Sequence, residues 1–169
     1  MIIKFKFLKK PRHLVPFTVL QKQEQRKGVP NAENVAFIRH IEVLVHRKKY
    51  TLEKKEGNLH VFTVNGQRRT TPYRGRNGEQ AIVIGDQLVF TTKFGLTILW
   101  DGNQQAQVLL CDTYRRYVCG LCGNADGNPR NDFVDPNRRP VALKGHKYTR
   151  YFNWGSKWRV PDSSTNDEV

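Results

Sequence analysis

The chain has 169 residues, a length that suits one domain with a buried core. Its formal net charge is +14, and residues 1–56 carry 14 basic against 5 acidic side chains. No stretch approaches the roughly 18 apolar residues of a membrane-spanning helix. No zinc-finger spacing, RNA-binding aromatic signature or basic zipper accompanies the charge, so we expect neither a membrane span nor a nucleic-acid partner.

The first 34 residues are expected to hold little regular structure. Pro11, Pro16 and Pro30 interrupt them, and only a short strand near residues 17–20 fits the pattern. The opening stretch MIIKFKFLKK is too short and too charged for the apolar core of a signal peptide. We therefore treat residues 1–13 as a basic N-terminal segment that precedes the domain.

From residue 35 onward the pattern is typical of β-strands. Ile41, Val43 and Val45 recur at every second position, which predicts that they share one face of a strand. Three turn signals separate apolar runs: Asn65-Gly66, Gly85-Asp86 and Asp101-Gly102. Strands at this spacing, without a helix before residue 140, predict an all-β fold built as an antiparallel sandwich or barrel. Residues 141–158 are expected to close the domain as a short helix or an irregular segment, and residues 161–169 to be a disordered tail.

Three cysteines lie within twelve residues, and their odd number leaves at least one without a partner in this chain. Cys119 and Cys122 form a CxxC, a spacing used for thiol–disulfide exchange when a helix begins there. The glycine-rich loop that follows does not favour a helix. Zinc would need a fourth ligand, and neither Cys111 nor the downstream His146 belongs to a second paired motif. The residues alone leave redox chemistry, a metal loop and a disulfide-pinned turn open.

The loop after the CxxC is dense in side-chain oxygens. Calcium takes six to eight oxygen ligands from carboxylates, amides and backbone carbonyls, and five residues could supply them: Asn124, Asp126, Asn128, Asn131 and Asp132. The spacing is not that of an EF-hand. The alternative is a loop of Asx turns, in which each side chain caps nearby backbone N–H groups. The residue types do not choose between the two.

A basic run, Arg47-Lys48-Lys49, interrupts the first β-rich segment. Such a run is typical of contact with a polyanion, for example a heparin-like glycosaminoglycan. The alternative is an ordinary solvated surface. We keep polyanion binding through these three residues as a hypothesis.

Three segments together resemble a known family. FGLTILWDGN (94–103), CGLCGNADGNPRNDF (119–133) and WGSKWRV (154–160) resemble, in order and spacing, the C-terminal portion of a von Willebrand factor type D domain. Weaker similarity extends the match over residues 14–160. The resemblance implies an extracellular β-sandwich, found in mucins, zonadhesin- and tectorin-like matrix proteins and crossveinless-type regulators. It also implies a non-enzymatic module for protein–protein interaction or assembly.

The resemblance further implies roles for the loop and the cysteines. The five loop residues above become calcium ligands, and the CGLC tetrapeptide either is structural or aids assembly by disulfide exchange. Cys111, Cys119 and Cys122 allow three single bridges, and none is preferred. The family's opening Gly-Asp-Pro-His segment and several of its cysteines do not occur in this sequence, so the resemblance predicts a partial domain. The expected partners are other extracellular proteins, or the rest of a larger multidomain chain, with a secreted location.

Overall fold

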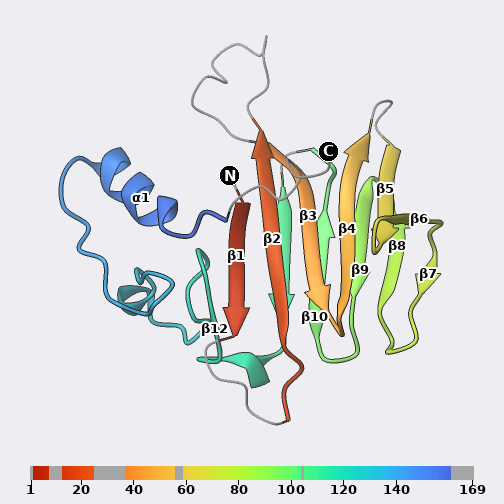
Figure 1. Ribbon diagram of the computed structural model, residues 1–169, viewed down its shortest axis with the longest axis horizontal. Helices are drawn as coiled ribbons and strands as arrows, with labels where there is room; N and C mark the ends of the chain where they lie inside the picture. Colours follow the sequence, from red (N-terminus) through yellow and green to blue (C-terminus); the bar gives the residue numbers. More distant parts are fainter. Residues whose placement is uncertain (1, 8–12, 25–36, 56–58, 104, 161–169) are drawn as a thin grey trace, which may run out of the picture.

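A computed structural model describes residues 2–7, 13–24, 37–55, 59–103 and 105–160 (Figure 1). The strands among them form two antiparallel sheets, and one short α-helix lies at their side. The all-β prediction is confirmed. The predicted tail at residues 161–169 lies outside the described residues. No helix in the described ranges is long and apolar enough to cross a membrane.

The larger sheet has seven strands in the order β12-β1-β2-β3-β4-β5-β6, and each neighbouring pair is antiparallel. Its strands are β1 (Ile2–Phe7), β2 (Phe17–Glu24), β3 (Phe37–Val45), β4 (Lys48–Lys55), β5 (Leu59–Val64), β6 (Gln67–Arg69) and β12 (Val118–Cys119). The smaller sheet has the order β11-β10-β9-β8-β7. Its strands are β7 (Tyr73–Arg74), β8 (Gln80–Ile84), β9 (Gln87–Thr91), β10 (Leu96–Trp100) and β11 (Ala106–Leu110).

The two sheets pack face to face around one apolar core. Val43 and Tyr50 of the larger sheet belong to the same buried cluster as Phe90 and Ile98 of the smaller sheet. The rings of Tyr50 and Phe90 are 4.9 Å apart between centroids, which is contact distance for aromatic side chains. The inward-facing positions of each strand therefore build a sandwich, as the period-two alternation predicts.

The three predicted hairpin turns are all present. Asn65 and Gly66 have φ values of 51° and 78°, the left-handed conformation that a two-residue hairpin requires, and they join β5 to β6. Gly85-Asp86 joins β8 to β9. Asp101 begins a longer loop between β10 and β11, in which its Oδ1 accepts hydrogen bonds from the backbone of residues 103 and 105.

The expectation that residues 1–34 hold little regular structure is wrong for residues 2–7 and 21–24, which belong to strands, while the strand near residues 17–20 is confirmed and residues 1, 8–12 and 25–34 lie outside the described residues. β1 lies between β12 and β2 in the larger sheet, and β2 continues to Glu24. The physical reason is visible in the sequence, because Lys4 and Lys6 alternate with apolar neighbours at the period of two that a strand requires. Pro16 lies just before β2 and so interrupts no ladder.

The C-terminal part of the domain closes with α1 (Lys147–Ser156), which confirms the short helix expected there. In Figure 1 this helix and the loops before it lie beside the β12–β1 side of the larger sheet. Trp154 and Trp158 both donate their indole N–H to the carbonyl oxygen of Val134, at 2.9 and 3.0 Å. Phe133 packs edge-to-face on Trp154. These contacts attach the helix to the segment that follows the asparagine-rich loop.

Candidate functional site

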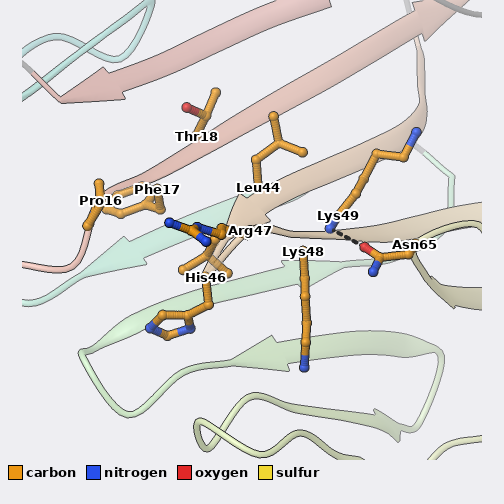
Figure 2. Close-up of a pocket in the computed structure, with 10 residues that line it drawn as sticks. Pro16, Phe17, Thr18, Leu44, His46, Arg47, Lys48, Lys49 and Asn65 are labelled. Atoms are coloured by element: carbon orange, nitrogen blue, oxygen red, sulfur yellow. Dashed lines mark hydrogen bonds between the residues drawn. The ribbon is translucent and has the colours of Figure 1, made fainter.

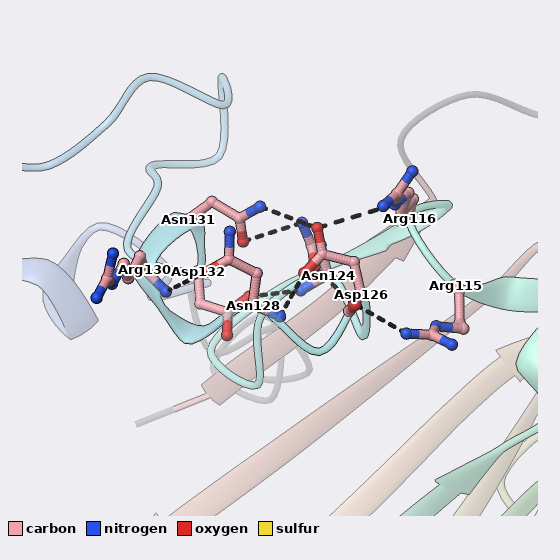
Figure 3. A network of polar contacts seen from close by, with 8 residues as sticks. All are labelled: Arg115, Arg116, Asn124, Asp126, Asn128, Arg130, Asn131 and Asp132. Carbon is pink, nitrogen blue, oxygen red and sulfur yellow. Dashed lines mark hydrogen bonds and ion pairs between the residues drawn. The ribbon is translucent and has the colours of Figure 1, made fainter.

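The asparagine-rich loop follows β12 and ends in a short 3₁₀ turn, η4 (Pro129–Asn131). It brings the five predicted ligand residues into one surface region (Figure 3). Gly123 begins the loop with a φ of 78°, and a Cβ at this position would collide with the carboxylate of Asp132. A glycine is therefore needed for the loop to close on Asp132.

A series of Asx turns builds the loop backbone. Asn124 Oδ1 accepts from the N–H of Asp126 at 2.9 Å, and Asp126 Oδ1 accepts from the N–H of Asn128 at 2.8 Å. Asn128 Oδ1 then accepts from the N–H of Arg130 at 3.1 Å and caps η4. The even spacing of these residues thus follows from side chains that each bond the backbone two residues further on. The Asx-turn interpretation of the spacing is confirmed.

Three of the predicted ligands meet at one oxygen. Asp126 Oδ2 accepts from the side-chain amide of Asn131 at 2.9 Å and from that of Asn124 at 3.2 Å. Asp132 lies behind them, where its Oδ1 accepts from the backbone N–H of Asn124 at 3.1 Å. Asn128 instead caps η4. The structure therefore gathers Asn124, Asp126 and Asn131 closely, with Asp132 adjacent to them.

Two arginines that the sequence did not connect with the loop lie against it. Arg115 donates from Nη2 to the backbone oxygen of Asp126 at 2.8 Å, and Arg116 Nε lies 4.0 Å from Asp126 Oδ2. The side-chain amide of Asn131 and the backbone N–H of Asn128 lower the pKa of Asp126, and the charge of Arg116 adds to the effect. Asp126 is therefore ionised at neutral pH. No local pattern links these arginines to residues ten positions away.

The loop residues fit calcium in the chemistry of their donors. They offer two carboxylates and three amide oxygens: Asn124 and Asn128 each keep a second lone pair on the oxygen that accepts in an Asx turn, and Asn131 presents its oxygen after a half-turn of its amide. A pocket of about 190 Å³ adjoins them and is lined by Gly123, Asn124, Asn131 and Asp132, among others. Within the described ranges, no three His, Cys, Asp or Glu side chains form a cluster suited to a metal. A zinc site thus gains no support, and any calcium site would depend on amide oxygens.

The three cysteines are all described, and no disulfide joins any two of them. Cys119 is buried in β12, in register with Lys6 of β1. Desolvation of the thiol, followed by the negative charge of Asp132, raises the pKa of Cys122. A raised pKa lowers the thiolate fraction, and residues 119–123 form a strand end and a turn, not the start of a helix. This geometry does not fit a redox CxxC.

Arg47, Lys48 and Lys49 lie at the hairpin turn between β3 and β4, where His46 and Arg47 have φ values of 51° and 60°. They line a pocket of about 590 Å³ that is separate from the asparagine-rich loop (Figure 2). The pocket is also lined by Leu44 and by residues at the start of β2. The basic run is therefore the rim of a pocket and not an isolated charged turn.

A buried carboxylate, which no sequence pattern predicts, lies beneath the same turn. The Glu79 side chain has no exposed surface, and its Oε1 accepts from His46 Nδ1 at 2.8 Å and from Asn77 Nδ2 at 3.1 Å. Burial opposes its ionisation, but the hydrogen bonds, that from His46 first, outweigh burial and lower the pKa of Glu79 to about 2. Because Glu79 precedes β8 and His46 follows β3, the pair connects the two sheets.

Comparisons with known proteins give a consistent result. A family model for the von Willebrand factor type D domain matches residues 10–139. The chain is 33% identical over 149 residues to the human (Homo sapiens) IgGFc-binding protein, a match that covers 88% of this chain and 2% of that protein. It is 34% identical over 128 residues to human zonadhesin, covering 76% of this chain and 4% of the relative. It is 37% identical over 117 residues to chicken (Gallus gallus) mucin-5B, covering 67% and 5%. The chain thus spans a small fraction of each relative.

Proposed function

Because this chain belongs to the von Willebrand factor type D domain family, we propose that it is a non-enzymatic module for adhesion or assembly in an extracellular protein. Zonadhesin and mucin-5B support an extracellular setting, since their names denote an adhesive protein and a mucin. Its partners would be other extracellular proteins or the remainder of a larger multidomain chain. Among the described residues, polar and charged side chains gather at the asparagine-rich loop and at the basic pocket. Both regions suit the binding of an ion or a partner.

We further propose that the loop of residues 123–132 binds calcium. The observation that carries this proposal is the convergence of Asn124 and Asn131 on one ionised oxygen of Asp126. Two amide N–H groups now satisfy that oxygen, and a cation placed there would use the second lone pair of Asn124 Oδ1, which keeps its Asx turn, and the oxygen of Asn131 after that amide turns over. Asp132 would complete the set with a second carboxylate. The bound ion would hold the loop rigid as a surface for partners.

Calcium affinity should be modest. Only two of the five side chains carry a charge, and few charged ligands weaken a calcium site. Arg116 also places a positive charge 4.0 Å from Asp126 Oδ2, although its side chain is 80% exposed and water screens it. We expect a dissociation constant of about 10⁻⁴ to 10⁻³ M, the range of extracellular calcium modules.

Isothermal titration of the whole chain with calcium chloride tests the proposal, with magnesium chloride as the competing ion. Asp126→Asn retains an Oδ1 acceptor for the backbone of Asn128 but removes the charge, so it should weaken calcium binding at least about tenfold. Asp135→Asn is the matched control. Asp135 also caps backbone N–H groups, at 2.8 and 2.9 Å, but it lies outside the proposed ligand set, and its variant should bind calcium normally.

Thermal unfolding gives a second readout. Calcium at ten times its dissociation constant should stabilise the folded chain by about 1.4 kcal/mol, which raises the melting temperature by about 3–5 °C. Arg116→Gln should strengthen calcium binding by up to about fivefold, because it removes a nearby positive charge. No binding at about 10 mM calcium, together with an unchanged melting temperature, would remove the metal from the proposal and leave a loop held by its Asx turns.

A further inference from the structure

The floor of the basic pocket at the β3–β4 turn is Leu44, which is held in a row of hydrogen-bonded residues. Thr18 of β2 is in register with Leu44 of β3, which is in register with Lys49 of β4. Asn65 extends this row, since its N–H donates to the Lys49 carbonyl and its Oδ1 accepts from the Lys49 N–H. Leu44 is 37% exposed at the centre of the row. Three hydrogen-bonded strands and the β5–β6 turn thus present one solvent-facing leucine with polar groups around it (Figure 2).

The rim of the pocket has a single sign of charge. Arg47, Lys48 and Lys49 line it, and none of the ten lining residues is acidic. Across the part of the chain that the structure describes, no ion pair engages these three cations. The nearest buried carboxylate, Glu79, is already bonded to His46 beneath the turn. The positive charge is therefore available to a partner.

The turn is also held in place before any ligand arrives. His46 is fixed from below by Glu79 at 2.8 Å and packs edge-to-face on Phe94. The adjacent Arg47 has a φ of 60° in the hairpin turn. A pocket whose backbone is already ordered loses less conformational entropy when it binds.

We propose that this pocket binds an acidic peptide segment of an extracellular partner, with an apolar side chain between carboxylates. The carboxylates pair with Arg47 and Lys49 beside Leu44 and with Lys48 at the end of the hairpin, where its side chain points to the other side of β4, and the apolar side chain covers Leu44. A heparin-like polysaccharide would satisfy the cations but has no apolar group to cover the floor. A volume of about 590 Å³ lies within the usual range for ligand sites and accommodates a short segment.

Fluorescence anisotropy with a defined probe tests the proposal. The probe is a fluorescein-labelled octapeptide in which glutamates surround one leucine and one phenylalanine. A first comparison peptide replaces every glutamate with glutamine. A second, the serine peptide, replaces the leucine and the phenylalanine with serine. At about 0.15 M salt the first peptide should bind most tightly, and affinity should fall as salt rises. The triple variant Arg47→Gln, Lys48→Gln, Lys49→Gln should weaken binding at least about tenfold. Leu44→Ser should weaken the apolar peptide several-fold and leave the serine peptide unchanged.

A matched control removes the same charge elsewhere. The triple variant Arg139→Gln, Lys144→Gln, Lys157→Gln neutralises three exposed cations outside the pocket and should change peptide affinity by less than about twofold. Equal losses in the two triple variants would overturn the proposal, because they would show attraction to net charge alone. Binding of a heparin oligosaccharide that depends on the pocket cations, with peptide binding that does not, would overturn it in favour of a polysaccharide.

NMR titration of the wild-type chain tests the proposal without any variant that could fail to fold. Addition of the acidic peptide should shift the NMR signals of the Leu44 methyl groups and the Thr18 amide, which lie in the row that forms the floor. The signals of Asn124 and Asn131, in the separate loop, should stay in place. Shifts that spare Leu44 and Thr18 would overturn the proposal whatever the variants do.

Discussion

The substitution Glu79→Gln tests how much one buried carboxylate contributes to the joint between the two sheets. The side chain is fully buried and accepts hydrogen bonds from His46 at 2.8 Å and from Asn77 at 3.1 and 3.2 Å. These donors lower the pKa of Glu79 from an ordinary 4.5 to about 2. At about 1.4 kcal/mol per pKa unit, the ionised form stabilises the fold by about 3 kcal/mol. Glutamine keeps the shape and one acceptor oxygen, so we expect a loss of about 2 kcal/mol.

The pH dependence of that loss gives the sharper test. A carboxyl whose pKa is lower in the folded chain stabilises the fold above its ordinary pKa, and this contribution disappears as the pH falls toward the folded value. For Glu79 the window runs from 4.5 down to about 2. The difference in unfolding free energy between the wild type and Glu79→Gln should therefore be full at neutral pH and should shrink below about pH 4.5.

Urea denaturation at about pH 7, 4.5 and 3 measures this difference. Glu42→Gln is the matched control, because Glu42 also pairs with a histidine, His40, at 3.0 Å, but both side chains are more than 20% exposed. Water screens that pair, so its loss should cost less than about 1 kcal/mol. A Glu79→Gln penalty that stays constant from neutral pH to about pH 3 would refute the assignment of a lowered pKa to Glu79.

Three further outcomes follow from the packing and the thiols. Tyr50→Phe should change the unfolding free energy by about 1 kcal/mol or less in urea, because the buried hydroxyl has no hydrogen bond of ordinary length in the described part of the chain, although it lies near enough to Glu79 to help lower the pKa of that carboxyl; a larger loss would show a full bond to Glu79. Trp158→Phe should cost about 1–2 kcal/mol, since it removes the 3.0 Å bond to the Val134 carbonyl, and an unchanged melting curve would contradict this. In the reduced chain, Cys111 should react with a disulfide reagent before Cys122. The Thr113 hydroxyl lowers the pKa of Cys111, and desolvation raises the pKa of Cys122. Peptide mapping that finds the reverse order would contradict this prediction.

The sequence predicted the hairpins because each depends on neighbours in the chain. Asn65-Gly66 and Gly85-Asp86 carry their turn conformation in their own residue types, and the strands on either side pair with each other. β1 has a local alternation of its own, but its place in the sheet depends on a distant partner. One edge of β1 pairs with β12, where Phe7 is in register with Val118, and the alternation does not identify a partner more than a hundred residues away. The joint between Glu79 and His46 was missed for the same cause.

The asparagine-rich loop illustrates a limit of composition as a predictor of chemistry. Its residue types predicted both calcium ligands and Asx turns, and the backbone bonds from Asn124 to Arg130 show that the turns form from the side chains themselves. Composition cannot fix which way an amide faces, since that depends on partners such as Asp126 and on Arg115 and Arg116 behind it. A loop that is already bonded in this way does not need a metal to fold. Calcium would therefore replace the amide N–H contacts at Asp126 Oδ2 while the Asx turns remain, and its contribution to stability should follow the free calcium concentration instead of deciding whether the domain folds.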